Sequence, residues 1–271
     1  MKVLHDHLYT GAKVHVWVED DVSKSVLELL WNDARIRLHV AGDARKASLA
    51  VDVTSEGAPA VVVAVLDRDF RTPKPDAWSD PGTKLLYLES HEVENLLLDF
   101  DALAAVSNRR REEVERVTRE AAEGLLWWAA CCASLATLRK GVPHLLPRPP
   151  AIGAVTTLGQ AVDHVAAPDG LPAHQKALRE IDRERITDVV RGHGRELNAE
   201  LETDAWKKSF PGKQIMHHIR SRLPTLDTAG KSSPRERDLD LAKRLAREMG
   251  RSSVPDEAKR LRTALLHRAG L

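Results

Sequence analysis

Residues 60–69 read AVVVAVLDRD, seven apolar residues followed by two aspartates that flank an arginine. Four of the seven apolar residues are valines, and a β-branched run without a polar position is typical of a strand buried on both faces, as in parallel sheets. Because the run ends in Asp67 and Asp69, two carboxylates follow the carboxyl end of the predicted strand. Ligands of open parallel sheets bind outside that edge.

A second predicted strand lies upstream, at about residues 13–18, and it also ends in an acid, Glu19. Between the two strands the pattern predicts a helix at about 22–32, a short strand at about 35–40 and a helix at about 44–53. This alternation is typical of a parallel βαβ sheet. It therefore places Glu19 at the same sheet edge as the two aspartates. Carboxylates crowded together there repel one another unless a cation lies between them, and hard oxygen ligands suit Mg²⁺ or Mn²⁺.

Downstream, the proline-containing segment 71–83 predicts a loop, residues 84–88 a fourth strand, and a helix is expected to begin near Ser90. From about Phe100 the pattern is helical. We expect helices at about 109–139, 173–190, 194–205, 211–222, 234–249 and 255–268, with a proline-rich break at 141–153 and a linker at 227–234. The fold class is therefore α/β, a parallel four-stranded sheet flanked by helices and followed by a mostly helical C-terminal part.

We expect three segments along the chain. Residues 1–100 would form the α/β catalytic domain, residues 101–226 a helical extension that completes it, and residues 227–271 a basic helical segment. The net charge is only +1, but residues 206–271 hold 16 Lys or Arg against 7 Asp or Glu, whereas residues 1–205 hold 25 against 33. Such a basic segment favours a polyanionic partner, although a solvated helix surface explains it equally well.

Two features bear on the compartment. The N-terminus shows no secretion signal, which predicts a cytoplasmic protein. The most apolar stretch, residues 125–138, is too short to span a bilayer and predicts a buried helix without membrane contact. We interpret Cys131 and Cys132 within it as small buried hydrophobic residues of a reduced protein.

The strand ends Val18-Glu19 and Leu66-Asp67-Arg68-Asp69 resemble those of a Toprim domain. That family includes topoisomerases, primases, nucleases of the overcoming-lysogenization-defect type and ribonucleases that mature 5S RNA. Residues 92–98, EVENLLL, and residues 210–213, FPGK, resemble elements of a bacterial Toprim-like family designated DUF4435. The likeness covers about residues 13–222 and implies a Toprim-like fold.

The resemblance implies roles for four acids. Glu19 would be the general acid or base, or a second metal ligand. Asp67 and Asp69 would bind Mg²⁺ or Mn²⁺, and Glu94 would complete the acidic cluster. The chemistry suits these residue types, because carboxylate-held dications stabilise the charge that develops on phosphodiester oxygens during cleavage.

Three further residues are weaker candidates for the site. Glu92 is a second-choice member of the cluster, and Lys213 near a helix N-terminus would hold a substrate phosphate. The chain departs from many Toprim sequences in having Asp20 and Ser23 where those sequences have Gly and Asp. Asp21 is a candidate substitute for the missing acid.

The function implied is a metal-dependent nuclease that acts on DNA or RNA, tRNA included, as an effector of anti-phage defence beside a separate ABC-type ATPase. Residues 211–214, PGKQ, lack the upstream glycine and the final Ser or Thr of an ATP-binding loop, so we expect no intrinsic ATPase activity. The oligomeric state is open, with a homodimer among the options.

Three alternatives stay open. A phosphatase of the haloacid dehalogenase class also uses Asp-x-Asp after a strand, but Arg71 stands where that class usually has Thr or Val. Strand passage by a topoisomerase needs a tyrosine nucleophile, and only Tyr9 and Tyr87 exist. The third alternative is a non-catalytic sensor that binds nucleic acid through its basic C-terminal helices.

Overall fold

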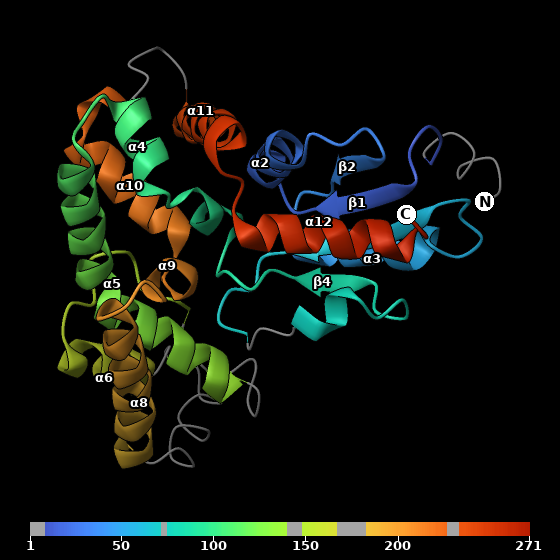
Figure 1. Ribbon diagram of the computed structural model, residues 1–271. Coiled ribbons are helices and arrows are strands. Elements are labelled where there is room, and N and C mark those ends of the chain that lie inside the picture. Colours follow the sequence, from blue (N-terminus) through green and yellow to red (C-terminus); the bar gives the residue numbers. More distant parts are fainter. Residues whose placement is uncertain (1–8, 72–74, 140–147, 167–182, 227–232) are drawn as a thin grey trace. The chain divides into compact units, whose positions relative to one another are not determined.

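A computed structural model describes residues 9–71, 75–139, 148–166, 183–226 and 233–271. Its centre is a four-stranded, all-parallel sheet of order β2-β1-β3-β4 (Figure 1). The strands are β1 (Val14–Val18), β2 (Ile36–Val40), β3 (Val61–Leu66) and β4 (Leu85–Tyr87). This confirms the predicted α/β class and all four strands. Val14 pairs with both Ile36 and Val61, so β1, β2 and β3 run in step and their carboxyl ends share one edge.

Helices cover both faces of the sheet because side chains alternate along each strand. On one face Val62, Ala64 and Leu66 of β3 form a buried cluster with residues of α3 (Ala44–Thr54). The other face is covered by α2 (Asp21–Trp31) and α12 (Asp256–Arg268), and Figure 1 shows α12 in front of the sheet with α3 behind it. The indole N–H of Trp31 donates to the Ala258 carbonyl at 2.9 Å, which joins the two helices.

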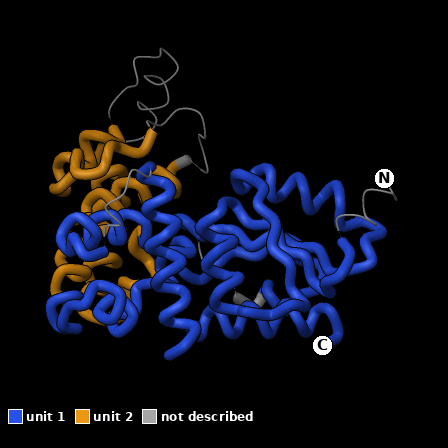
Figure 2. The backbone as a smooth tube through the Cα atoms, turned by 90° about the horizontal axis from the view of Figure 1, so that it is seen from above, with its two compact units in different colours: residues 1–114, 212–271 blue, residues 115–211 orange. Residues whose placement is uncertain are grey.

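The described chain forms two compact units (Figure 2). Unit 1 comprises residues 1–114 and 212–271, and it contains the sheet and the C-terminal helices. Its other elements are η1 (Pro75–Trp78), η2 (Val93–Leu97), α4 (Phe100–Ser107), α10 (Gly212–Arg222), η3 (Pro224–Leu226) and α11 (Pro234–Ser252). The helix ends follow capping rules, since the Asp43 carboxylate accepts the Lys46 N–H at 2.8 Å at the start of α3.

Two expectations for this unit are corrected. The segment 71–83 is not entirely loop, because Pro75–Trp78 forms a 3₁₀ turn. No helix begins at Ser90: residues 89–92 form bends, Glu92 itself has extended backbone angles, and the 3₁₀ helix η2 begins at Val93. Pro75 begins the 3₁₀ turn η1, and proline is favoured at the first position of a helix. The Asn95 side chain accepts a hydrogen bond from the Glu92 N–H, and this bond fixes where η2 starts.

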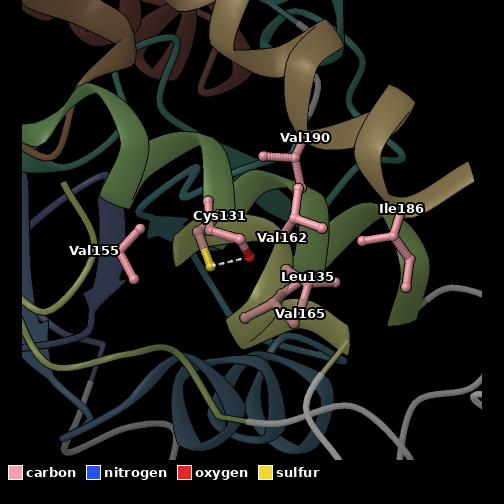
Figure 3. Packing of buried hydrophobic residues seen from close by; sticks show 8 residues of the cluster. Cys131, Leu135, Val155, Val162, Val165, Ile186 and Val190 are labelled. Atoms are coloured by element: carbon pink, nitrogen blue, oxygen red, sulfur yellow. Dashed lines mark hydrogen bonds between the residues drawn. The ribbon is translucent and has the colours of Figure 1, made fainter. Parts of the chain in front are cut away.

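Unit 2, residues 115–211, is helical. It contains most of α5 (Arg111–Arg139), together with α6 (Leu158–Ala166), α8 (Arg183–Leu201) and α9 (Trp206–Ser209). Figure 3 shows its core, in which Cys131 and Leu135 of α5 pack against Val162 of α6 and Val190 of α8. Both cysteines are buried and neither forms a disulfide, as predicted, and the Cys131 thiol lies 3.9 Å from the Ala161 carbonyl.

The helix boundaries of unit 2 differ from the prediction. The two helices expected at 173–190 and 194–205 are one helix from residue 183 to 201, and residues 173–182 lie outside the described part of the chain. The short helix α6 was not predicted. Most of the proline-rich break at 141–153 and of the linker at 227–234 also lies outside the described residues.

One helix among the described residues, the segment 111–138 of α5, is long and apolar enough to cross a membrane by length and composition. The helix is longer than the apolar stretch recognised in the sequence because a polar first half precedes it. Half of its most apolar window is buried inside the structure. A core helix meets the same criterion, so this is weak evidence for a membrane span.

Candidate metal centre

Acids that follow β1 and β3 meet at the carboxyl edge of the sheet. Glu19 comes directly after β1, and its Oε1 accepts a hydrogen bond from the Asp67 N–H at 3.1 Å. Asp67 comes directly after β3, and its Oδ1 accepts the Val93 N–H at 2.9 Å. The first bond joins two neighbouring strand ends and the second joins β3 to the segment after β4. The fold therefore brings together acids that are far apart in the sequence.

Asp69 and His91 are joined through their backbones. Asp69 adopts a left-handed conformation with φ of 51°, which Asp tolerates better than most residues. In that conformation its N–H donates to the His91 carbonyl at 2.8 Å. Its side chain stays exposed, and Arg71 lies 3.8 Å away as a loose ion-pair partner.

Asp69, His91 and Glu92 form the tightest group, which we call the metal triad. One potential ligand atom from each residue lies within 4.8 Å of the others. The imidazole of His91 is 3% exposed, and the edge of the Phe70 ring packs against it at 4.6 Å between ring centres. Within the described residues nothing hydrogen-bonds His91 Nδ1, so this buried nitrogen is unpartnered.

Glu92 is held from two sides. Its Oε2 accepts the N–H of Lys213 at 2.8 Å, at the start of α10, and its own N–H donates to Asn95 Oδ1 at 2.8 Å. Residue 212 must be glycine for this approach, because a Cβ there would lie 2.6 Å from the Asn95 nitrogen. The Lys213 N–H therefore donates its hydrogen bond to Glu92, so only the side chain of Lys213 could contact a phosphate.

Glu94 is not a member of the triad, but it interacts with Glu92 and Asp67. It lines a small cavity of about 20 Å³ together with Lys213 and apolar residues of α2, α10 and α11. Burial raises the pKa of Glu94 to about 8, and the neighbouring Glu92 carboxylate adds to this effect. The carboxylate of Glu94 is in turn the strongest charge that raises the pKa of Asp67, after burial itself.

The remaining acids are perturbed in the same direction. Burial raises the pKa of Glu92 to about 7, and the Lys213 N–H offsets part of the effect. Burial also raises the pKa values of Glu19 and Asp69, with the Asp67 N–H and the Arg71 guanidinium respectively opposing it. Because all five pKa values are raised, these carboxyl groups together carry less negative charge in the folded protein than they would in water. A bound dication reverses this, because it favours the charged carboxylates.

Two neighbouring acids have other partners. Asp20 caps α2, since its Oδ1 accepts the Ser23 N–H at 2.8 Å. Asp21, the candidate substitute for the missing Toprim acid, pairs with Arg235 at 2.7 Å. Of the consecutive acids Glu19, Asp20 and Asp21, only Glu19 thus accepts the Asp67 N–H.

The structure gathers Glu19, Asp67, Asp69 and Glu94 at one edge, and we call these four together with Glu92 the acidic cluster. Sequence reasoning ranked Glu92 below Glu94 on helical spacing. Glu92 precedes the 3₁₀ helix in extended backbone, so that spacing does not apply and both carboxylates reach the cluster. Sequence reasoning missed His91. Its position after the fourth strand, beside Glu92, was the signal that could have identified it.

No protein-family model matches this chain, and no curated protein does. The residues themselves fit a divalent cation. Carboxylate oxygens and an imidazole nitrogen are ordinary ligands for such ions, and the unpartnered His91 nitrogen lacks any other use within the described residues. Asp69, His91 and Glu92 would hold the ion, and Asp67 lies beside them.

Proposed function

We propose that this chain is a metal-dependent nuclease, which hydrolyses phosphodiester bonds of DNA or RNA at the acidic cluster. The observation that carries the proposal is the convergence of Glu19 and Asp67, from adjacent parallel strands, on the edge that also holds the metal triad. A dication bound there would stabilise the charge on the attacking and leaving oxygens of the phosphodiester.

Glu19 is suited to move a proton. Its carboxylate is fixed by the Asp67 N–H, and burial raises its pKa above the ordinary value. A carboxyl group whose pKa is raised holds a proton more readily than a free glutamate does, and a positioned carboxyl group can pass that proton to or from a reacting oxygen. Glu19 would therefore act as the acid or base, and Asp67, whose carboxylate is aimed by the Val93 N–H, would orient groups at the same edge.

Positive charge near the C-terminus supports a polyanionic substrate. An open groove of about 610 Å³ in unit 1 is lined by Trp78, Lys259, Arg260 and His267. Arg260 also pairs with both oxygens of Glu89 at 2.6 Å, three residues before Glu92, so the groove adjoins the segment that carries the triad. Lys259 and Arg260 each pair with an acid, Asp256 and Glu89, so the support for a phosphate-bearing substrate comes from the net positive charge of residues 206–271.

The Toprim resemblance of the two strand ends supports the same proposal, and it extends to a role in anti-phage defence beside an ABC-type ATPase. Two features of this chain enter the resemblance, namely its parallel sheet and the acids at the carboxyl edge of that sheet. An ATPase partner would be a separate protein.

The test is cleavage of supercoiled plasmid, and of total RNA that includes tRNA, with Mg²⁺ or Mn²⁺. EDTA-treated protein and the variants Glu19→Gln and Asp67→Asn are the negative arms, and Asp52→Asn, an exposed acid on α3, is the matched control. We expect cleavage by the wild type and by Asp52→Asn, and a loss of at least about 10²-fold in the two cluster variants.

Two results would count against the proposal. Wild-type protein as inert as Glu19→Gln on both nucleic acids would contradict it. Turnover of a small phosphate ester that is lost in Asp67→Asn, without any cleavage of nucleic acid, would favour the phosphatase alternative instead.

A further inference from the structure

We propose that the metal triad includes the His91 imidazole as a direct ligand, so that the site selects a transition-metal dication over Mg²⁺. This deepens the proposed function by naming the class of metal at its site. Metal affinity can be measured without nucleic acid, so the inference can fail or stand independently of nuclease activity.

The geometry of the triad carries the proposal. Potential ligand atoms of Asp69, His91 and Glu92 lie within 4.8 Å of one another, a spacing that a single ion at about 2.0–2.2 Å from each ligand can bridge after small side-chain rotations. An imidazole is 97% hidden there, since His91 is 3% exposed, and none of the described residues hydrogen-bonds its Nδ1. Buried polar atoms are almost always paired, so an unpartnered nitrogen beside two carboxylates is available to coordinate a metal.

The backbone around the triad is fixed. The Asp69 N–H bonds the His91 carbonyl at 2.8 Å, and the Lys213 N–H bonds the Glu92 carboxylate at 2.8 Å. Glu89 and Ser90 directly precede the triad residues His91 and Glu92. Their N–H groups donate to the buried carboxylate of Glu257 at 2.6 Å and 3.0 Å. These bonds hold residues 89–92 from α10 and α12, and held ligands are what a metal site requires.

The ligand types determine the selectivity. Mg²⁺ prefers all-oxygen coordination and keeps much of its water, whereas an imidazole nitrogen suits Zn²⁺, Co²⁺, Ni²⁺ and Fe²⁺. A site made only of Asp67, Asp69 and Glu94 would favour Co²⁺ less strongly, and its preference would not depend on His91. The dependence of the Co²⁺ preference on His91 therefore distinguishes the two ligand sets.

The experiment is titration of the purified chain with Co²⁺ and with Mg²⁺, followed by calorimetry and, for Co²⁺, by visible absorption. We expect Co²⁺ to bind at least about tenfold more tightly than Mg²⁺, and His91→Gln to lose about 10–100-fold in Co²⁺ affinity with little change for Mg²⁺. His193→Gln, which alters a half-buried histidine of α8 outside the triad, is the matched control and should bind Co²⁺ like the wild type.

Co²⁺ binding that is unchanged in His91→Gln would overturn the inference, whatever its ratio to Mg²⁺ binding. Should His91→Gln not fold, as judged by circular dichroism, X-ray absorption of the Co²⁺-loaded wild type decides the question. Scattering from an imidazole ring around cobalt supports the inference, and an all-oxygen shell overturns it. If the wild type binds cobalt through the His91 imidazole but cleaves no nucleic acid, the proposed function is refuted and this inference stands.

Discussion

The Asp67 N–H donates a hydrogen bond to the carboxylate of Glu19 at 3.1 Å, across 48 residues of sequence. The bond forms because β1 and β3 are hydrogen-bonded neighbours in parallel register, so that both chains leave the sheet at one edge. It uses one oxygen of the Glu19 carboxylate and holds that carboxylate beside the end of β3. The relationship is the local reason why the acidic cluster exists.

Glu94→Gln should make the metal-free protein less sensitive to rising pH. Burial raises the pKa of Glu94 from 4.5 to about 8, so the folded chain holds a proton that the unfolded chain releases above pH 4.5. The stability that this proton contributes is complete below about pH 4.5 and is lost as the pH rises to about 8. Urea unfolding in EDTA at pH 5 and pH 8.5 measures the difference.

We expect the wild type to lose on the order of 1 kcal/mol or more relative to Glu94→Gln between those two pH values. A parallel pH dependence in the two proteins would contradict the assignment of a retained proton to Glu94. Addition of a dication at pH 8.5 should restore stability to the wild type, because a bound cation favours the charged carboxylates.

Gly212→Ala should destabilise unit 1. The added Cβ would lie 2.6 Å from the Asn95 nitrogen and 2.7 Å from its Oδ1, so the start of α10 must move away from η2. Forced contacts of this kind cost about 1–3 kcal/mol. The movement also pulls the Lys213 N–H from Glu92, so the affinity for a dication should fall as well.

The matched control is Gly192→Ala in α8, where a Cβ meets nothing within 4 Å. Alanine is the better helix former there, so this variant should be neutral or stabilised by up to about 1 kcal/mol. Thermal unfolding of both variants measures the contrast. Equal melting temperatures for them would show that α10 and η2 are not in close contact.

Glu257→Ala should both destabilise the chain and weaken metal binding. The buried carboxylate accepts three hydrogen bonds, from the Glu89 and Ser90 N–H groups and the Ser90 hydroxyl. Buried donors left unpaired cost about 2–4 kcal/mol in total, and the segment that leads to the triad loses its support from α12. Urea unfolding and Co²⁺ titration report the two effects separately.

Its neighbour Asp256 provides the control, because that side chain is 90% exposed and pairs only with Lys259 among the described residues. Asp256→Ala should cost about 0.5 kcal/mol or less and leave Co²⁺ affinity unchanged. An equal loss of stability in both variants would mean that Glu257 does not support the segment.

Lys213→Met should weaken nucleic-acid binding without weakening metal binding. The lysine is exposed at the start of α10 and lies near Glu94, so its charge opposes a bound dication while attracting phosphate. Removal of one phosphate contact should lower the salt dependence of binding by about one unit of slope. Lys46→Met, on the exposed surface of α3, is the control for net charge. Identical salt slopes in the two variants would exclude a phosphate contact at Lys213.

Much of unit 1 was predictable from local sequence. The valine run of β3 and the acid-capped helices α2 and α3 have strong periodic patterns, and consecutive βαβ units allow few topologies. The segment after β4 was mispredicted because Glu92 and Asn95 form local hydrogen bonds that delay the helix start. In unit 2, α6 has only nine residues, too few for a clear helical pattern.

The candidate site was predictable in part. Glu19, Asp67 and Asp69 stand at strand ends, where the rules of parallel sheets give acids a meaning. His91 and Glu92 follow the fourth strand, which was a signal for them, but tertiary contacts fix where their side chains lie. The bonds from Lys213 and Glu257 come from helices more than 100 residues away in the sequence.

The most direct test of a cation at this sheet edge is anomalous diffraction from crystals of the wild type grown with Mn²⁺ or Co²⁺. We expect an anomalous peak between the side chains of Asp69, His91 and Glu92, within about 2.0–2.3 Å of a ligand atom from each. Ordered side chains in this arrangement with no peak among them, at a saturating concentration of the ion, would contradict it.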